Sequence, residues 1–285
     1  SGALSLGAAS RIAFQLGAPG TPGVGSDLIN VGGNLILDGT LDVTNAGGFG
    51  AGLYRLINFG GTLTDNGLEI GAKPAGFAAN AFTVQTAVAR QVNLLVGAAA
   101  PVGSFTFWDG SNNTSNNVVD GGAGVWTTTG ANWTLVNGAT NGAYDPAQLL
   151  IFSGTGGVVT VDSTAAPITV ATGMQFATNG YTLSGGALQL TAPTNALAFG
   201  STIRVGDGTA AGAAITANIA TALTGPSGLL KTDLGTLRLT GANTYLGETR
   251  VLAGNLIQAG GTLGGTTAES ALRVAIDPGS IASLA

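Results

Sequence analysis

Short runs that alternate between apolar and polar residues recur along the chain. In residues 236–240, Leu237 and Leu239 share one side, while Thr236, Arg238 and Thr240 share the other. Residues 35–43 alternate in the same way. A period of two is typical of strands that bury one face. The pattern therefore predicts an all-β protein.

In the second half of the chain the expected strands are short and regularly spaced. Gly, Asn, Thr or Pro residues separate strand centres that mostly lie about 7–12 residues apart. About three strands per coil would give a coil of roughly 20–28 residues, which is the period of a solenoid. The centres lie near Ile151, Val161, Ile168, Phe176, Leu183, Leu188, Ile203, Ile215, Leu230, Leu237, Val251 and Leu256.

The first part of the chain contains further candidate strands, followed by a featureless stretch of small residues at 97–104. That stretch is the predicted junction between two units. Residues 1–100 would form the closing coils of one unit, and residues 101–285 the start and body of the next. The two units are expected to stack as one continuous solenoid. The candidate strands of the first part are residues 11–16, 27–31, 35–43, 53–59, 82–85 and 92–96.

The clearest local pattern occupies residues 228–256. A strand around Leu237 leads into turn residues, and a second strand around Val251 follows. Gly and Asn suit such turns because both tolerate positive φ, and Asn can hydrogen-bond the nearby backbone. The stretch is therefore interpreted as one coil. Its pattern rests on Gly235, Leu237, Leu239, Gly241, Asn243, Tyr245, Gly247, Val251 and Gly254.

Residues 235–254 resemble the autotransporter-associated β-strand repeat, also called the passenger-associated transport repeat. Residues 26–57 resemble, more loosely, the closing coils of an autotransporter passenger. The resemblance implies a right-handed, single-stranded parallel β-helix, exported to the extracellular side of a Gram-negative outer membrane. It also implies a monomeric passenger segment whose link to the membrane is a separate C-terminal translocator.

A sandwich of antiparallel hairpins is the alternative fold, since it also has short strands and frequent turns. Asn-Gly pairs at Asn66, Asn137, Asn141 and Asn179 favour it, because Asn-Gly is a strong hairpin signal. Only the pairs at Asn66 and Asn179 have plausible strands on both sides. The parallel β-helix, with about three short strands per coil, is therefore the predicted fold.

Composition agrees with stacked strands and narrows the range of partners. Gly accounts for 49 of 285 residues, and charged residues make up 8% of the chain. Such a chain suits stacked strands in which Asn, Thr and Ser form side-chain ladders. With nine Lys and Arg and a pI near 4.4, nucleic acid is not expected as a partner.

The residues needed for common catalytic or metal sites are scarce. The chain has no His and no Cys, which removes imidazole and thiol chemistry. Asp38 and Asp42 share a face, but four residues of strand separate them by about 13 Å, whereas glycosidase pairs need ~5–9.5 Å. The two lysines, Lys73 and Lys231, are placed in turns far apart in sequence. No catalytic, cofactor or metal residue is predicted, and an enzyme is not expected.

Residues 105–144 contain all three tryptophans beside an Asn-rich stretch. As an exposed aromatic platform, they would suit contact with protein or glycan. The other interpretation is that the tryptophans fill the first coils of a unit. The candidate contact residues are Trp108, Asn112, Asn113, Asn116, Asn117, Trp126 and Trp133.

Three functional hypotheses follow from these features. The resemblance implies a surface adhesin that binds host extracellular-matrix or cell-surface protein, with fibronectin as the first candidate. The second hypothesis is a structural stalk that assists secretion, with binding elsewhere in the passenger. The third, disfavoured for lack of a carboxylate pair, is a carbohydrate-active β-helix enzyme. The sequence is expected to be a fragment of a longer passenger, because it lacks a signal peptide and an initiating Met.

Overall fold

The computed structural model describes residues 2–17, 26–78, 80–97, 105–191, 200–260, 263 and 274–276. Within these ranges the chain consists of short strands joined by turns, together with a short 3₁₀ helix, Ala210–Ala214. Most strand pairs are parallel, and neighbouring strands in a sheet belong to successive coils. The predicted β-helix is therefore confirmed, and the sandwich of hairpins is wrong.

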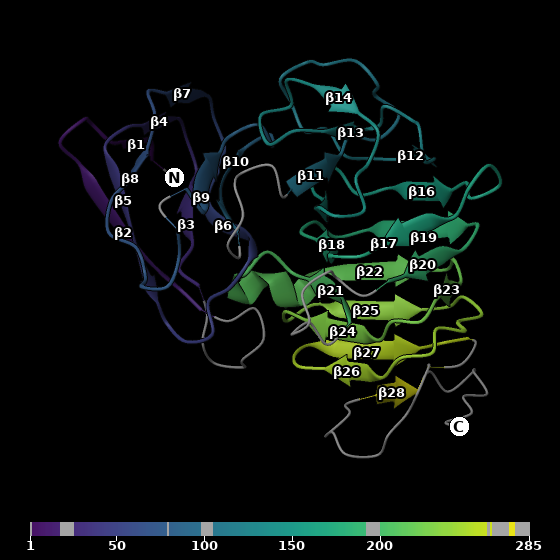
Figure 1. The fold of residues 1–285 in the computed structure, drawn as a ribbon. Coiled ribbons are helices and arrows are strands. Elements are labelled where there is room, and N and C mark those ends of the chain that lie inside the picture. The colour runs from purple at the N-terminus through teal and green to yellow at the C-terminus, as the bar shows by residue number, and fades with distance from the viewer. Residues whose placement is uncertain are drawn as a thin grey trace.

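The first group of strands forms a stack of three-sided coils (Figure 1). Leu35, Leu37, Leu41 and Val43 all face its core, as their alternation predicts. A corner at Gly39, with φ of 87°, divides the expected run into two strands on different sheets. The sheets contain β1 (Leu4–Ser5), β4 (Leu35–Leu37) and β7 (Leu63–Asp65); β2 (Arg11–Leu16), β5 (Thr40–Asn45) and β8 (Glu69–Ile70); and β3 (Ile29–Val31), β6 (Gly52–Phe59), β10 (Gln91–Val96) and β9 (Phe82–Gln85).

Strands β6, β10 and β9 close this first stack. β10 runs antiparallel to both β6 and β9, whereas β3 and β6 are parallel. On the β10 side of β6 the sheet continues only through the antiparallel strands β10 and β9, so in the described sheets the parallel coils of the first stack end at β6.

The second group of strands forms a longer stack, which opens with the antiparallel pairs β11–β13 and β13–β14 and then continues in parallel. Its first sheet contains β14 (Asn141–Gly142), β13 (Trp133–Thr134), β11 (Phe105–Trp108), β15 (Leu149–Phe152), β18 (Gly173–Phe176), β21 (Ser201–Val205), β24 (Leu229–Thr232) and β26 (Thr249–Val251). The second contains β12 (Gly124–Trp126), β16 (Val158–Val161), β19 (Tyr181–Gly185), β22 (Thr216–Ile219), β25 (Thr236–Leu239), β27 (Asn255–Gln258) and β28 (Val274–Ile276). The third contains β17 (Ile168–Val170), β20 (Leu188–Leu190) and β23 (Leu223–Thr224).

The strand register gives the size of each coil. Thr216 lies beside Thr236, and Thr236 beside Asn255, so these coils contain 20 and 19 residues. Gly173 lies beside Thr202, which makes that coil 29 residues long. These three lengths are close to the expected period. Two other coils are longer than expected, because Tyr181 lies beside Ala217 and Gly124 beside Val159, which gives 36 and 35 residues.

The two stacks lie side by side. In the described part of the chain, every sheet belongs to one stack or the other, and an isolated bridge between Ser26 and Thr209 crosses between them. The closing strands of the first stack lie against the flank of the second (Figure 1). The ladders therefore do not run on as the one continuous solenoid that was expected. The boundaries at 1–100 and 101–285 stay a prediction, since residues 98–104 lie outside the described ranges.

Candidate functional site

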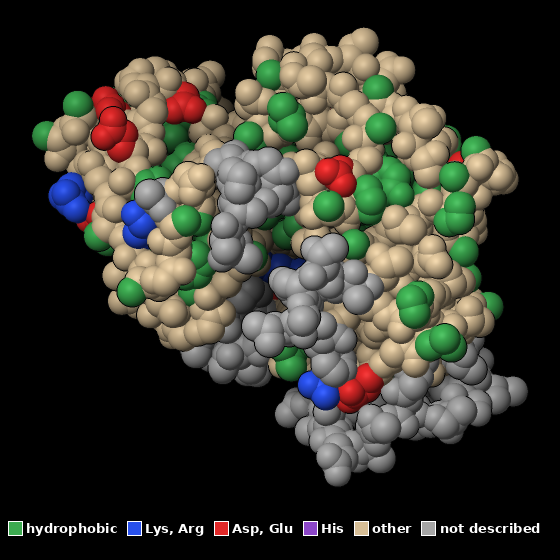
Figure 2. All heavy atoms as spheres, in the orientation of Figure 1, with side chains coloured by type: hydrophobic (Ala, Val, Ile, Leu, Met, Phe, Trp, Pro, Cys, Tyr) green, Lys and Arg blue, Asp and Glu red, His purple; other side chains and the backbone are tan. Residues whose placement is uncertain are grey.

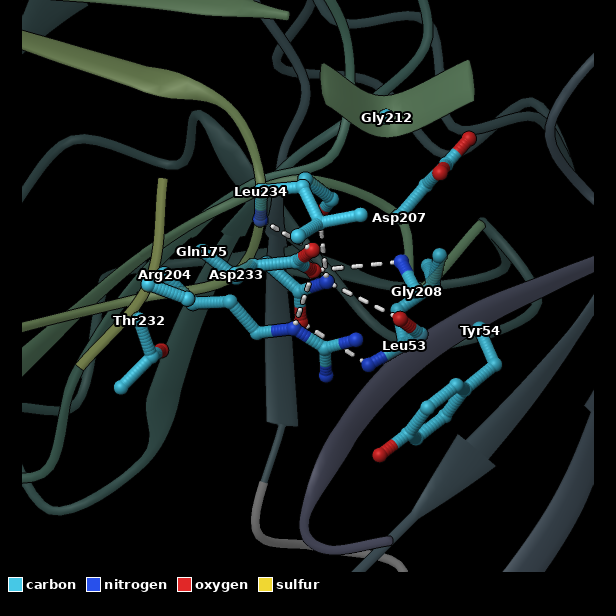
Figure 3. Close-up of polar contacts among 12 residues, drawn as sticks. Leu53, Tyr54, Gln175, Arg204, Asp207, Gly208, Gly212, Thr232, Asp233 and Leu234 are labelled. Carbon is cyan, nitrogen blue, oxygen red and sulfur yellow. Dashed lines mark hydrogen bonds and ion pairs between the residues drawn. The ribbon is translucent and has the colours of Figure 1, made fainter. Parts of the chain in front are cut away.

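The two stacks meet at the open edge of β6. β10 pairs with residues 52–58 along one edge, while in the described sheets β3 covers only residues 57–59 of the other. Gln175 of β18 fills the vacant position, as its Oε1 accepts the Leu53 N–H at 2.8 Å and its Nε2 donates to the Leu53 carbonyl at 3.0 Å. The Gln175 side chain thus bonds the strand edge as a neighbouring peptide group would (Figure 3).

Asp207 extends this contact by two residues along β6. The Arg55 N–H donates to the backbone carbonyl of Asp207 at 2.9 Å. The Arg55 guanidinium lies 3.9 Å from the Asp207 carboxylate and donates to Asn93 Oδ1 at 2.9 Å. The backbone N–H and the guanidinium of Arg55 are therefore both held at the junction.

Arg204 places a buried positive charge between the stacks. Its Nε donates to Asp233 Oδ2 at 2.9 Å, and its Nη1 donates to the Ala51 carbonyl at 3.3 Å. The guanidinium carbon lies 4.6 Å from the centroid of the Tyr54 ring, so a cation–π contact joins the two stacks. The ion pair, the hydrogen bonds of Nε and Nη1 and the ring contact offset the cost of burying this charge, although the buried Nη2 has no hydrogen-bond partner among the described residues (Figure 3).

Asp233 is the anion that holds Arg204. Its carboxylate also accepts the N–H groups of Gly208 at 3.1 Å and Leu234 at 2.7 Å. Its φ of 66° lies in the left-handed region, which is uncommon for a residue with a side chain. The three donors, Arg204 Nε and the two N–H groups, fix the carboxylate in place.

Two glycines permit the close approach. A Cβ on Gly52 would clash with the Arg204 guanidinium, and a Cβ on Gly208 would clash with the Tyr54 ring. Both adopt positive φ, at 136° and 81° respectively. Glycine is therefore required by contact and by backbone conformation at both positions.

An apolar cluster continues the junction toward β11. Phe107, Ile151, Gln175 and Arg204 are in register on successive strands of one sheet, so they form one column along the flank. The apolar members pack with Leu53 and other residues of the first stack. The flank is thus apolar beside β11 and β15 and polar beside β18 and β21.

The structure contradicts the prediction that Lys231 lies in a turn. The residue lies instead in β24, on the inward-facing column that contains Ile203, and it is fully buried. Its Nζ donates to the carbonyls of Thr232, Asp233 and Ala253 at 2.7–3.0 Å. Burial lowers the pKa of Lys231 to about 7, although the charge of Asp233 acts in the opposite direction.

The tryptophans are core residues rather than an exposed platform. Trp108, Trp126 and Trp133 are 0%, 0% and 1% exposed. They form edge-to-face contacts with one another and pack on Phe152. They therefore fill the opening coils of the second stack, as the other interpretation of residues 105–144 holds.

The carboxylate of Asp120 anchors the Asn-rich loop, residues 112–117, through hydrogen bonds. Its Oδ2 accepts the side-chain amides of Asn112 at 2.9 Å and Asn116 at 2.7 Å. Asn113, Asn116 and Asn117 are exposed. Of the predicted contact residues, these three thus have outward positions, and their role in binding stays a prediction.

The residues of the motif lie on one coil and shape its interior. Leu237 and Leu239 of β25 are fully buried. Asn243 Oδ1 accepts the buried N–H of Leu223 on the preceding coil at 3.0 Å, and the hydroxyls of Tyr245 and Thr249 lie 2.6 Å apart. Gly235 precedes β25, Gly241 and Gly247 lie between β25 and β26, Val251 ends β26, and Gly254 precedes β27.

The carboxylates considered for catalysis have structural partners. Asp42 accepts hydrogen bonds from Nε and Nη2 of Arg11, and Asp38 accepts one from the Gly39 N–H at 2.7 Å. Asp27 accepts the Gln15 N–H at 2.8 Å. Among the described residues, no cluster of His, Cys, Asp or Glu is suited to hold a metal ion. Nor does any helix in the described ranges have the length and apolar character needed to cross a membrane.

A family model for the passenger-associated transport repeat matches residues 229–257. Residues 229–257 are a passenger-associated transport repeat. The match covers the coil described above, from β24 to β27. The sequence resemblance at 235–254 is therefore confirmed.

A relative extends the similarity beyond the repeat. The chain is 48% identical over 261 residues to the adhesin BmaC autotransporter of Brucella suis biovar 1 (strain 1330). The alignment covers 90% of this chain but 7% of that relative. No solved structure matches the chain. The chain thus resembles the passenger of a Gram-negative autotransporter, and its predicted location on the extracellular side of the outer membrane is confirmed.

Proposed function

We propose that the chain is a segment of a non-enzymatic surface adhesin that contacts host extracellular-matrix or cell-surface protein. The observation that carries the proposal is the 48% identity over 261 residues to an autotransporter described as an adhesin. Because the chain spans 7% of that relative, adhesion by this segment has to be tested on the segment itself.

The geometry supports recognition by an extended face. Val158, Thr182, Asn218 and Arg238 are in register on β16, β19, β22 and β25. They form an outward column of largely uncharged side chains. On the side of the molecule drawn in Figure 2, few charged side chains lie over the second stack. Such a face would contact a protein through many small contacts, together with the exposed Asn113 and Asn117.

Fibronectin is the first partner to test. In a solid-phase assay, the purified chain should bind immobilised fibronectin or another matrix protein in a saturable manner above an albumin control. Absence of saturable binding to a panel of matrix proteins would contradict an adhesive role for this segment.

Surface variants would locate the contact. Asn113→Arg on the loop and Asn218→Arg on the outward column should weaken binding about tenfold if each disrupts a central contact. Thr64→Arg, at an exposed position of the first stack, is the matched control and should leave binding unchanged. Equal binding by all three variants would exclude both regions as the contact.

The second candidate function is a structural one, in which this segment supports export and display. The observation that favours it is the burial of the repeat, since Leu237, Leu239 and Tyr245 contact the core rather than solvent. Deleting residues 228–256 from the full passenger should then reduce surface display while adhesion per displayed molecule stays constant. Unchanged display with lost adhesion would contradict this role.

A further inference from the structure

We propose that the junction is a rigid elbow: the flank of the second stack binds the open edge of β6 and holds the two stacks at a fixed angle. The elbow concerns the shape of the passenger, and it does not depend on adhesion. Its parts are Gln175, Arg204 and Asp207 on the flank and residues 51–55 on the edge.

The flank bonds the β6 edge at two consecutive outward-facing positions, Leu53 and Arg55. In an antiparallel pair, alternate residues direct both N–H and C=O away from the partner strand. Leu53 and Arg55 are the alternate residues of β6 that face away from β10, and Gln175 and Asp207 bond to them. The flank therefore matches the hydrogen-bonding pattern of the edge residue by residue.

The contact between the two stacks spans several coils. Ala87 and Gln85 of the first stack bond to Val119 and Val136 near the opening of the second. Leu53 and Ala51 bond to Gln175 and Arg204, which lie one and two coils beyond β15. Contacts at separated heights resist both bending and twisting, whereas a single contact would act as a hinge.

Opening of the junction would expose a buried charge and leave backbone groups unpaired. Separation of the stacks would remove Tyr54 and the Ala51 carbonyl from Arg204, and would leave Leu53 without its partner. Domains of one chain usually move relative to each other unless their interface is large and apolar. Here an apolar cluster and a hydrogen-bonded polar cluster adjoin, so relative motion is opposed by both.

Spin labels would test the rigidity directly. The chain has no cysteine, so Asn66→Cys on the first stack and Thr160→Cys on the second can be labelled selectively at exposed positions. Double electron–electron resonance on the otherwise unchanged chain should give a single narrow distance distribution. A broad distribution would overturn the proposal.

Hydrogen exchange would test which residues hold the two stacks together. Arg204→Met and Gln175→Met should each speed exchange of the amides of residues 52–56 about tenfold or more, through loss of buried hydrogen bonds. Exchange at residues 236–239 should not change. Arg11→Met, which removes an exposed ion pair within the first stack, is the control and should leave both segments unchanged.

The two variants also separate local opening from general unfolding. Gln175→Met nearly preserves side-chain volume and keeps the Arg204–Asp233 pair, so it decides the case if Arg204→Met does not fold. A folded Gln175→Met variant with unchanged exchange at residues 52–56 and an unchanged distance distribution would overturn the proposal that Gln175 holds the two stacks together.

Discussion

At the scale of single residues, variants of Gly208 and Gly180 can separate the energetic cost of a strained backbone conformation from the cost of a steric clash. Gly208→Ala should lower the free energy of unfolding by about 2–4 kcal/mol, since it adds positive-φ strain to a clash with Tyr54. Gly180→Ala is the matched control, because Gly180 has φ of 89° but open space around its Cβ position. Denaturant unfolding would measure both. Equal losses would mean that contact with Tyr54 contributes nothing.

Lys231 makes stability depend on pH. Its pKa is lowered to about 7 in the folded chain from a usual value of 10.5, so between these values the unfolded chain binds the extra proton. The free energy of unfolding should therefore rise with pH across this window, by about 1 kcal/mol per pH unit. Below pH 7 the cost of the buried charge is fully present.

Lys231→Met provides the control for this pH dependence, because it keeps an apolar stem and removes the titrating group. The slope between pH 7 and 10 should flatten in the variant. The chain has no His and no Cys, so few other side chains titrate in that interval. A slope that persists in Lys231→Met would show that another group is responsible.

Asn243 connects the repeat to the preceding coil. Asn243→Ala should cost about 1–3 kcal/mol, because the buried N–H of Leu223 loses its acceptor. Asn113→Ala, at an exposed loop position, should change stability by less than about 0.5 kcal/mol. Thermal or denaturant unfolding of both variants would compare them, and similar costs would contradict a structural role for Asn243.

At the scale of elements, the strands fall into two kinds. β19, β20 and β25 alternate between buried and less buried positions, as half-exposed strands do. β11, β15 and β18 are buried throughout, and their sequences are correspondingly continuous apolar runs with one or two interruptions. This lack of alternation is the signal that could have identified the flank that contacts the first stack.

The flanking strands of the Asn-Gly pairs were predicted wrongly. Asn137-Gly138, which was not expected to have strands on both sides, lies in the turn between the antiparallel strands β13 and β14. Asn66 and Asn179, the pairs that were thought to have plausible strands on both sides, instead connect strands of different sheets. An Asn-Gly pair favours a tight turn, but the pairing of the flanking strands is set by the rest of the coil.

The aromatic cluster at the opening of the second stack should be a stability element. Trp133→Ala should lower the free energy of unfolding by about 3–5 kcal/mol, because it leaves a cavity among Trp108, Trp126 and Phe152. Ligand binding per folded molecule should not change. Loss of binding without loss of stability would contradict its place in the core.

At the scale of the whole molecule, the apolar cluster that contains Leu53 of the first stack and Phe107 of the second should couple the unfolding of the two stacks. The chain should unfold in one cooperative transition when followed by circular dichroism and by tryptophan fluorescence, since all three tryptophans report on the second stack. Gln175→Met combined with Arg204→Met should separate the two signals. Two transitions in the unchanged chain would show that the stacks are independent.

Much of the fold was open to prediction because it is local. The inward positions of Leu35, Leu37, Leu237 and Leu239 follow from alternation, and most predicted strand centres lie in observed strands. The candidate site was not predicted, because Gln175 and Arg204 are single polar residues in ordinary strands. Lys231 was predicted to lie in a turn, but hydrogen bonds from its Nζ to three backbone carbonyls allow it to lie inside the stack.

The sequence by itself determined the strand period, the repeat at 229–257 and the length of the coils around that repeat, since each depends on residues within one or two coils. Only the tertiary structure decided that the two stacks lie side by side. That arrangement depends on pairs such as Leu53 with Gln175 and Ala51 with Arg204, which are 122 and 153 residues apart. Hydrogen bonds at such separation leave no periodic trace in the sequence, because either partner alone looks like an ordinary strand or turn residue.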